Sequence, residues 1–111
     1  MSRPHYPPPA SRRAVRKLGA DIRAARLRRR LPMEVVAQRA ATSRMTVARI
    51  ERGDTGVGTG ILAAVLQALN LLDRFESVAD PSDDAVGQTI ALEELPKRAR
   101  LRRLAGPRDD G

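Results

Sequence analysis

The spacing of apolar residues predicts a chain of short helices. Between about residues 11 and 29, apolar side chains recur every three or four positions and so share one face of a helix: Val15, Leu18, Ile22 and Ala25. Ser11 is the expected N-cap of this helix, and its opposite face is rich in arginine. No run alternates convincingly as a strand, so an all-α fold is expected.

Two shorter helices are expected next, joined by a tight turn. Pro32 suits the first turn of a helix over about 33–40, because proline lacks only an amide that is free there anyway. That helix buries Val36, Ala37 and Ala40. After the turn at Ala41 and Thr42, Ser43 can cap a third helix, and Gly53 can end it with a positive φ. Val47 and Ile50 are its inward residues.

The later elements are shorter or less clearly marked. A fourth helix over about 60–69 follows the loop GDTGVGTG and is apolar through Ile61, Leu62, Val65, Leu66 and Leu69. Asp73 and Glu76 have the spacing of a capping box for a fifth helix that holds Phe75 and Val78. A sixth helix is weakly indicated from Ala85 to Leu95, before Pro96.

Composition divides the chain into three parts. Residues 1–10 hold four prolines and no periodic pattern, so a disordered arm is expected there. Residues 11–79 form the predicted domain. Residues 80–111 are expected to be a linker, the sixth helix and a basic tail that is disordered when unbound.

Several functional classes are excluded or disfavoured by composition. The chain has no cysteine, which excludes a disulfide framework, a thiolate metal site and a cysteine nucleophile. The start lacks the apolar core of a secretory signal, and the most apolar run, GILAAVLQALNLL, is too short to span a bilayer. A soluble, cytoplasmic protein without a membrane partner is therefore expected.

The distribution of charge favours a polyanion as partner. Residues 1–52 hold 14 Lys and Arg against three acidic residues, and residues 53–96 hold one Arg against eight acidic residues. Residues 97–111 are basic again, with six against two. A basic segment with helical periodicity is the electrostatic pattern of a nucleic-acid binder, although a merely solvated surface is the simpler alternative.

The predicted second and third helices have the order of a helix-turn-helix, whose second helix enters the DNA major groove with its N-terminal residues first. Arg44 could form a bidentate pair with guanine, and Met45 and the Thr46 methyl could contact thymine. Hydroxyl groups and arginines could contact phosphates or bases. The complete set of predicted DNA contacts is Met33, Ser43, Arg44, Met45, Thr46, Arg49, Arg52, Arg12 and Arg13.

The segment from Leu18 to Gly53 resembles the XRE (Cro/C1-type) helix-turn-helix family. Its most specific part, SRMTVARIERG, is similar to the family pattern Ser-x-x-Thr-(Ile/Val)-x-(Arg/Lys)-(Ile/Leu)-Glu-x-Gly. The resemblance implies a five-helix, lambda-repressor-like domain, and it implies an ion pair between Arg26 and Glu51. Three positions depart from the family: Met33 replaces a Gln that often contacts DNA, Ala41 replaces a turn Gly, and Pro32 replaces a capping Thr or Ser.

A narrower resemblance concerns the segments after the helix-turn-helix. GDTGVGTGILAAVLQALNLLDRF and DDAVGQTIALEELPKRARLRR are similar to the HipB-like antitoxins that accompany HipA-type kinase toxins. The implied function is a homodimeric repressor that binds a palindromic operator on double-stranded DNA, regulates its own operon and binds a HipA-like kinase toxin. The residues assigned to that partner are Lys97, Arg98, Arg100, Arg102 and Arg103. The alternatives are a regulator of the same fold without a toxin and a protein-interaction module with a basic tail.

An enzyme, a cofactor and a metal site are not expected. The loop GDTGVGTG lacks the preceding strand and the following Lys-Ser/Thr that a phosphate-binding loop requires. His5 lies in the proline-rich arm without a neighbouring ligand, and the acidic residues near the C-terminal part have no accompanying nucleophile or base.

Overall fold

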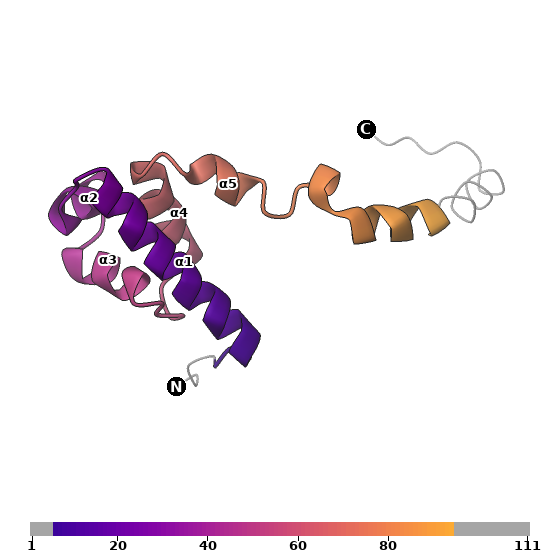
Figure 1. The fold of residues 1–111 in the computed structure, drawn as a ribbon, viewed down its shortest axis with the longest axis horizontal. Coiled ribbons are helices and arrows are strands. Elements are labelled where there is room, and N and C mark those ends of the chain that lie inside the picture. Colours follow the sequence, from indigo (N-terminus) through magenta and orange to yellow (C-terminus); the bar gives the residue numbers. More distant parts are fainter. Residues whose placement is uncertain (1–5, 95–111) are drawn as a thin grey trace. The chain divides into compact units, whose positions relative to one another are not determined.

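The computed structural model describes residues 6–94, and residues 1–5 and 95–111 lie outside the described part. The chain divides into two units, Met1–Phe75 and Glu76–Gly111. Figure 1 shows the helices in chain order: α1 (Pro9–Arg28), α2 (Met33–Arg39), α3 (Arg44–Glu51), α4 (Thr59–Ala68) and α5 (Leu72–Glu76). The described residues contain helices and no strand, so the expectation of an all-α fold is confirmed.

The first helix begins earlier than predicted. Its N-cap is Pro8, which makes no side-chain hydrogen bond, so the expected cap at Ser11 is wrong and Ser11 lies inside the helix. Pro9 is compatible with the first helical position, because the amide that proline lacks has no partner there. Residues just before the helix are held by Arg12, whose Nη1 donates to Pro7 O at 2.9 Å and whose guanidinium lies 4.4 Å from the Tyr6 ring centre.

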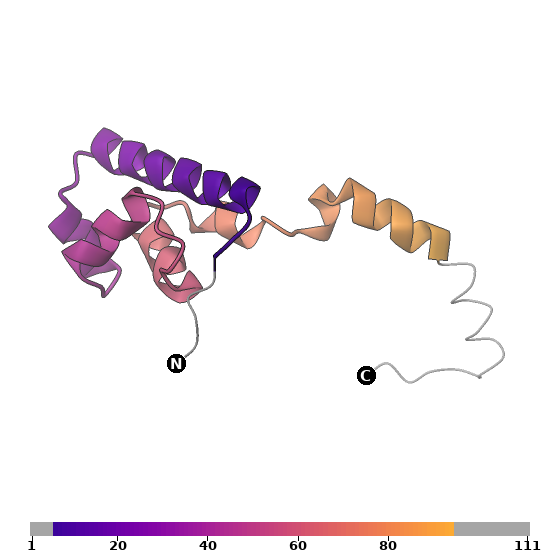
Figure 2. The ribbon, with the colours of Figure 1, turned by 90° about the horizontal axis from the view of Figure 1, so that it is seen from below.

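The core of the first unit is built from small and branched apolar residues of α1 to α4. Figure 2 shows α1 lying along one side of this group of helices. The expected inward residues of α2 and α3 are buried, as are those of the second half of α1. The buried apolar set is Ile22, Ala25, Val36, Ala37, Ala40, Val47, Ile50, Val65, Leu66 and Leu69.

Helices α1 to α4 all end in the same way, with a residue of positive φ. These residues are Arg30 (φ 53°), Ala41 (φ 54°), Gly53 (φ 80°) and Asn70 (φ 64°). After α2, the amide of Ala41 donates to Gln38 O and that of Thr42 to Ala37 O, which is the Schellman pattern. Because a Cβ disfavours positive φ, Ala41 and Arg30 carry backbone strain that glycine would not.

Glycine is required where α1 meets α3. A Cβ at Gly19 would lie 2.3 Å from Ile50 O and 2.9 Å from Glu51 O, so any side chain there would collide with the backbone of α3. Gly53 has a positive φ, and a Cβ there would lie 2.7 Å from the Arg16 Cα. This close approach fixes the C-terminal half of α3 against α1.

The capping box expected from Asp73 and Glu76 is not formed. α5 begins at Leu72, so Asp73 lies within the helix, whereas an N-cap residue needs an extended backbone. Val78, which was expected in the same helix, follows its end and is exposed.

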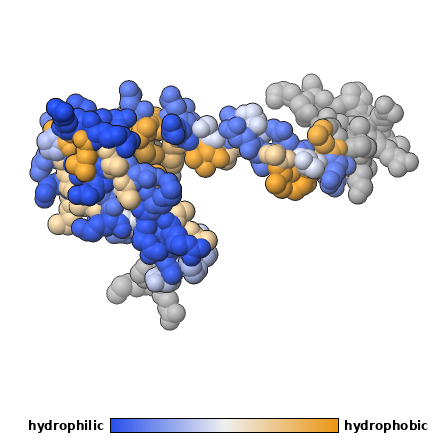
Figure 3. All heavy atoms as spheres, viewed as in Figure 1, coloured by the Kyte–Doolittle hydropathy of each residue, from blue (hydrophilic) through white to orange (hydrophobic). Residues whose placement is uncertain are grey.

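The second unit contains a single turn of 3-10 helix, η1 (Pro81–Asp83), and a helix that covers residues 85–94 within the described part. Asp80 caps η1 by accepting from Ser82 N, and Asp84 caps the next helix by accepting from Gly87 N at 3.0 Å. The predicted stop at Pro96 lies outside the described residues. Val86, Ile90 and Leu92 are exposed. Figure 3 shows apolar spheres at the surface of this unit. Within the described residues, no helix is long and apolar enough to cross a membrane.

Candidate nucleic-acid interface

Helices α2 and α3 pack against one another. A short turn joins them, and the positive φ of Ala41 makes this turn possible. Ser43 then has an extended backbone (φ −92°, ψ 155°), and its Oγ accepts a hydrogen bond from Thr46 N at 3.1 Å. Its Oγ also lies 2.9 Å from Thr46 Oγ1. The hydroxyl groups of Ser43 and Thr46 therefore both lie at the start of α3. Ser43 is the N-cap that the sequence predicts.

The inner face of α3 is buried against α1 and the rest of the core. Val47 and Ile50 are buried, and Glu51 is buried with them. Arg26 Nε donates to Glu51 Oε2 at 2.7 Å, and Arg26 Nη2 donates to Glu51 Oε1 at 2.9 Å. The third nitrogen, Nη1, donates to Leu31 O at 3.0 Å. These contacts leave the buried guanidinium and carboxylate fully paired.

The hydrogen bonds that Arg26 donates to Glu51 raise the pKa of Arg26, although burial alone would lower it. The bidentate geometry is the one that guanidinium and carboxylate groups favour. The pair is the one that the family resemblance implies, and it explains why a basic helix contains a single acidic residue.

The outer face of α3 carries the side chains predicted to read bases. Met45 is 73% exposed. Arg44 is also exposed, and its Nε lies 2.8 Å from Oε1 of Glu34, a residue in the first turn of α2. The first turns of the two helices are thus joined by an ion pair at the surface.

Arg49, about one turn further along α3, is held by a second carboxylate. Its Nε donates to Asp54 Oδ2 at 2.7 Å, and Asp54 Oδ1 accepts from the amide of Gly56 at 2.7 Å. The hydrogen bond from Arg49 lowers the pKa of Asp54, and the Gly56 amide lowers it further. The same pair raises the pKa of Arg49. A loop residue therefore orients an arginine of the outer face.

The other predicted contact residues differ in their surroundings. Met33 is half-buried and packs against the core, so much of its surface is used inside the domain. Arg52 is exposed at the C-cap of α3, and Arg13 is exposed on α1. Arg12 is half-buried through its contacts with Pro7 and Tyr6. The predicted partner-binding residues, Lys97, Arg98, Arg100, Arg102 and Arg103, lie outside the described residues.

Glu34 and Asp54, the two carboxylates that pair with arginines of α3, were not predicted from the sequence. Neither pair has helix i,i+4 spacing, so neither follows from a pattern within one helix. Asp54 gave a weak signal, because Asp followed two residues later by Gly is typical of a turn closed by the Asp side chain.

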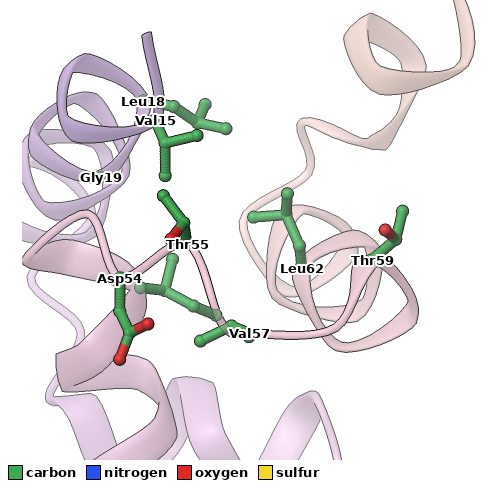
Figure 4. A pocket seen from close by; sticks show the side chains of 9 residues that line it. Val15, Leu18, Gly19, Asp54, Thr55, Val57, Thr59 and Leu62 are labelled. Carbon is green, nitrogen blue, oxygen red and sulfur yellow. The ribbon is translucent and has the colours of Figure 1, made fainter. Parts of the chain in front are cut away.

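A shallow hollow lies beside this surface, between the first half of α1 and the loop that precedes α4. Figure 4 shows its lining, and its volume is about 210 Å³. The lining residues are Val15, Leu18, Gly19, Ile50, Asp54, Thr55, Val57, Thr59 and Leu62. Asp54 is its single charged member, and that carboxylate is already bonded to Arg49 and Gly56. Among residues 6–94, no group of three or more His, Cys, Asp or Glu side chains could hold a metal ion.

Comparison with known proteins gives one family match. A family model described as a helix-turn-helix domain matches residues 17–76, which is more than half of the 111-residue chain. The matched segment includes most of α1, all of α2 to α4, and α5. No curated protein and no solved structure shows significant similarity to the chain.

Proposed function

The chain belongs to the helix-turn-helix domain family, whose members are DNA-binding regulators, and from this we propose that it is a sequence-specific transcriptional repressor. In this proposal, α3 lies in the major groove, with its N-terminal turn nearest the bases. Arg44 and Met45 contact base edges, and Arg49 contacts a base or the backbone one turn away. Arg13, Arg52 and the first-turn amides of α3 bind phosphates.

The observation that carries this proposal is the division of α3 into two faces. Val47, Ile50 and Glu51 are buried, whereas Arg44 and Met45 are exposed on the same helix. A helix that exposes a cationic side chain at its capped start, and whose opposite side is anchored to a core, suits docking into a groove. Figure 3 shows that hydrophilic side chains cover much of the visible face of this unit.

Fluorescence anisotropy tests the proposal. We expect the protein to bind the duplex upstream of its own gene more tightly than a random duplex of equal length and salt concentration. Arg44→Ala should remove about 1–3 kcal/mol of discrimination, because the guanine pair is lost. Arg13→Ala is the matched control, and it should weaken binding to both duplexes and reduce the salt slope. Equal affinity of the unmodified protein for both duplexes would contradict the proposal.

We further propose that the repressor acts as a homodimer on a palindromic operator. One α3 contacts only a few base pairs, and a symmetric dimer places two such helices one turn of DNA apart. Sedimentation equilibrium of the protein with its operator measures the stoichiometry. Two chains per duplex support the dimer, and one chain per duplex contradicts it.

The most specific part of the proposal is that this repressor is the antitoxin of a HipA-like kinase. Its support is the similarity of the loop after α3 and of the C-terminal sequence to HipB-like antitoxins. Affinity capture from the native cell should recover a kinase together with the full-length chain. Removal of residues 96–111 should abolish capture while operator binding survives. Operator binding without any captured kinase would favour a regulator that has no toxin.

A further inference from the structure

The structure places a carboxylate on the arginine that is best located to read a base. Arg44 occupies the first position of α3 and Glu34 lies in the first turn of α2, with Arg44 Nε and Glu34 Oε1 2.8 Å apart. We propose that Glu34 is a specificity-determining residue that acts through Arg44, by limiting the contacts of this arginine with DNA phosphates. This inference rests on the proposed DNA-binding function.

An arginine at this position would otherwise bind DNA of any sequence. The start of a helix already attracts anions through its free amides and dipole, and the first turn of α3 contains no acidic residue that would offset this attraction. A phosphate contact from Arg44 would strengthen binding to every duplex equally and carry no sequence information. The carboxylate of Glu34 neutralises the guanidinium and repels a phosphate that approaches the same place.

The pair is compatible with recognition of guanine. A guanidinium has five N–H donors, and Glu34 lies against Nε, whereas a bidentate pair with guanine O6 and N7 needs two donors. Arg44 can therefore remain beside Glu34 while it contacts a base. Because the carboxylate also restricts the arginine side chain, less conformational freedom is lost when the base contact forms.

A substitution of Glu34 tests this role more selectively than a substitution of Asp54. Asp54 also accepts the amide of Gly56, so a change there alters the turn after α3 as well as Arg49. Glu34 is 64% exposed in its side chain and lies outside the buried core, so its replacement by glutamine keeps size and helix while it removes the charge.

The experiment uses two labelled duplexes of equal length: one selected from a random-sequence pool by the unmodified full chain, and one of unselected sequence. Glu34→Gln is compared with Asp21→Asn, which removes the same charge from a different ion pair, Lys17 Nζ–Asp21 Oδ2 at 2.6 Å on α1. Compared with Asp21→Asn, Glu34→Gln should bind the unselected duplex roughly fivefold to tenfold more tightly at 0.1 M salt. Its log–log salt slope should steepen by about 0.9, the value for one added phosphate contact.

The selected duplex should gain less, so the ratio of selected to unselected affinity should fall in Glu34→Gln. The same comparison in an Arg44→Ala background shows whether Glu34 acts through Arg44. There, Glu34→Gln should have the same effect as Asp21→Asn. Equal behaviour of Glu34→Gln and Asp21→Asn with Arg44 present would overturn the role of Glu34. Failure of the unmodified chain to select any sequence would overturn the proposed function, and the role of Glu34 with it.

Discussion

The two faces of α3 use the same chemistry for different purposes. On the inner face, Arg26 and Glu51 form a bidentate pair with both side chains less than 10% exposed. On the outer face, Arg44 and Glu34 pair at a single nitrogen with both side chains about two-thirds exposed. The buried pair is fully satisfied and ties α1 to α3. The exposed pair is accessible to solvent and so remains available to a ligand.

Burial decides how much each of these ion pairs contributes to stability. An exposed pair contributes little to stability, because water screens it and both long side chains lose freedom. Breaking a buried pair is costly, because the remaining charge has no partner and little water. We therefore expect changes on the inner face to unfold the domain, and changes on the outer face to alter recognition while the fold persists.

The largest loss of stability is expected from Glu51→Ala. Removal of the carboxylate leaves the Arg26 guanidinium buried, so the free energy of unfolding should fall by about 3–5 kcal/mol in urea denaturation. Arg23→Ala is the control, because Arg23 is exposed and its Nε lies 4.0 Å from the same carboxylate. The control should change stability by no more than about 0.5 kcal/mol. Similar losses of unfolding free energy in both variants would show that burial does not decide what these ion pairs contribute.

Gly19→Ala should give the next largest loss. Alanine normally stabilises a helix by about 1 kcal/mol relative to glycine. Here its Cβ would meet the carbonyl oxygen of Ile50, so we expect a net loss of about 1–3 kcal/mol. The melting temperature measures this effect. A rise in melting temperature would contradict the close approach of α1 and α3.

A smaller loss is expected from Ser43→Ala. This change removes the hydrogen bond from Thr46 N to Ser43 Oγ and should cost about 1 kcal/mol. Ser11→Ala is the matched control, because Ser11 lies within α1 and caps nothing. Thermal denaturation of both variants separates the two positions. A loss of stability in Ser11→Ala as large as that in Ser43→Ala would show that Ser11 does act as a helix cap.

The smallest effect is expected from the pH dependence of the Arg49–Asp54 pair. Because the pKa of Asp54 is lower in the folded chain, its contribution to stability is fully present above the ordinary value of about 3.9. The contribution is lost as pH falls through the lower, folded value. An NMR titration should show the pKa of Asp54 rise towards its ordinary value in Arg49→Ala. An unchanged pKa would show that Arg49 is not its main cause.

Much of the fold follows from local sequence. The start and end of α3 were predictable, because Ser43 and Gly53 have the chemistry that a cap and a positive φ require. The inward residues of α2 and α3 followed from their spacing. The start of α1 was not found, because Ser11 suggested a cap more strongly than Pro9 suggested a first helical residue. A proline at the first position was the available signal.

Features that depend on contacts between distant segments were harder to predict. Gly19 has a role only because Ile50 lies beside it, and the sequence offers no more than an isolated glycine in a helix. The partners of Arg44 and Arg49 depend likewise on how the first turn of α2 and the loop after α3 are placed. The Arg26–Glu51 pair was accessible through the family resemblance, since the two residues are far apart in the chain.

The most direct test of the central claim, that the outer face of α3 is the surface that binds DNA, is NMR chemical-shift mapping. Isotopically labelled full-length protein would be titrated with the duplex that it selects. We predict that the largest amide shifts fall on α3, from Ser43 to Arg49, and that residues 76–94 change little. Large shifts confined to residues 76–94, with α3 unchanged, would contradict the account.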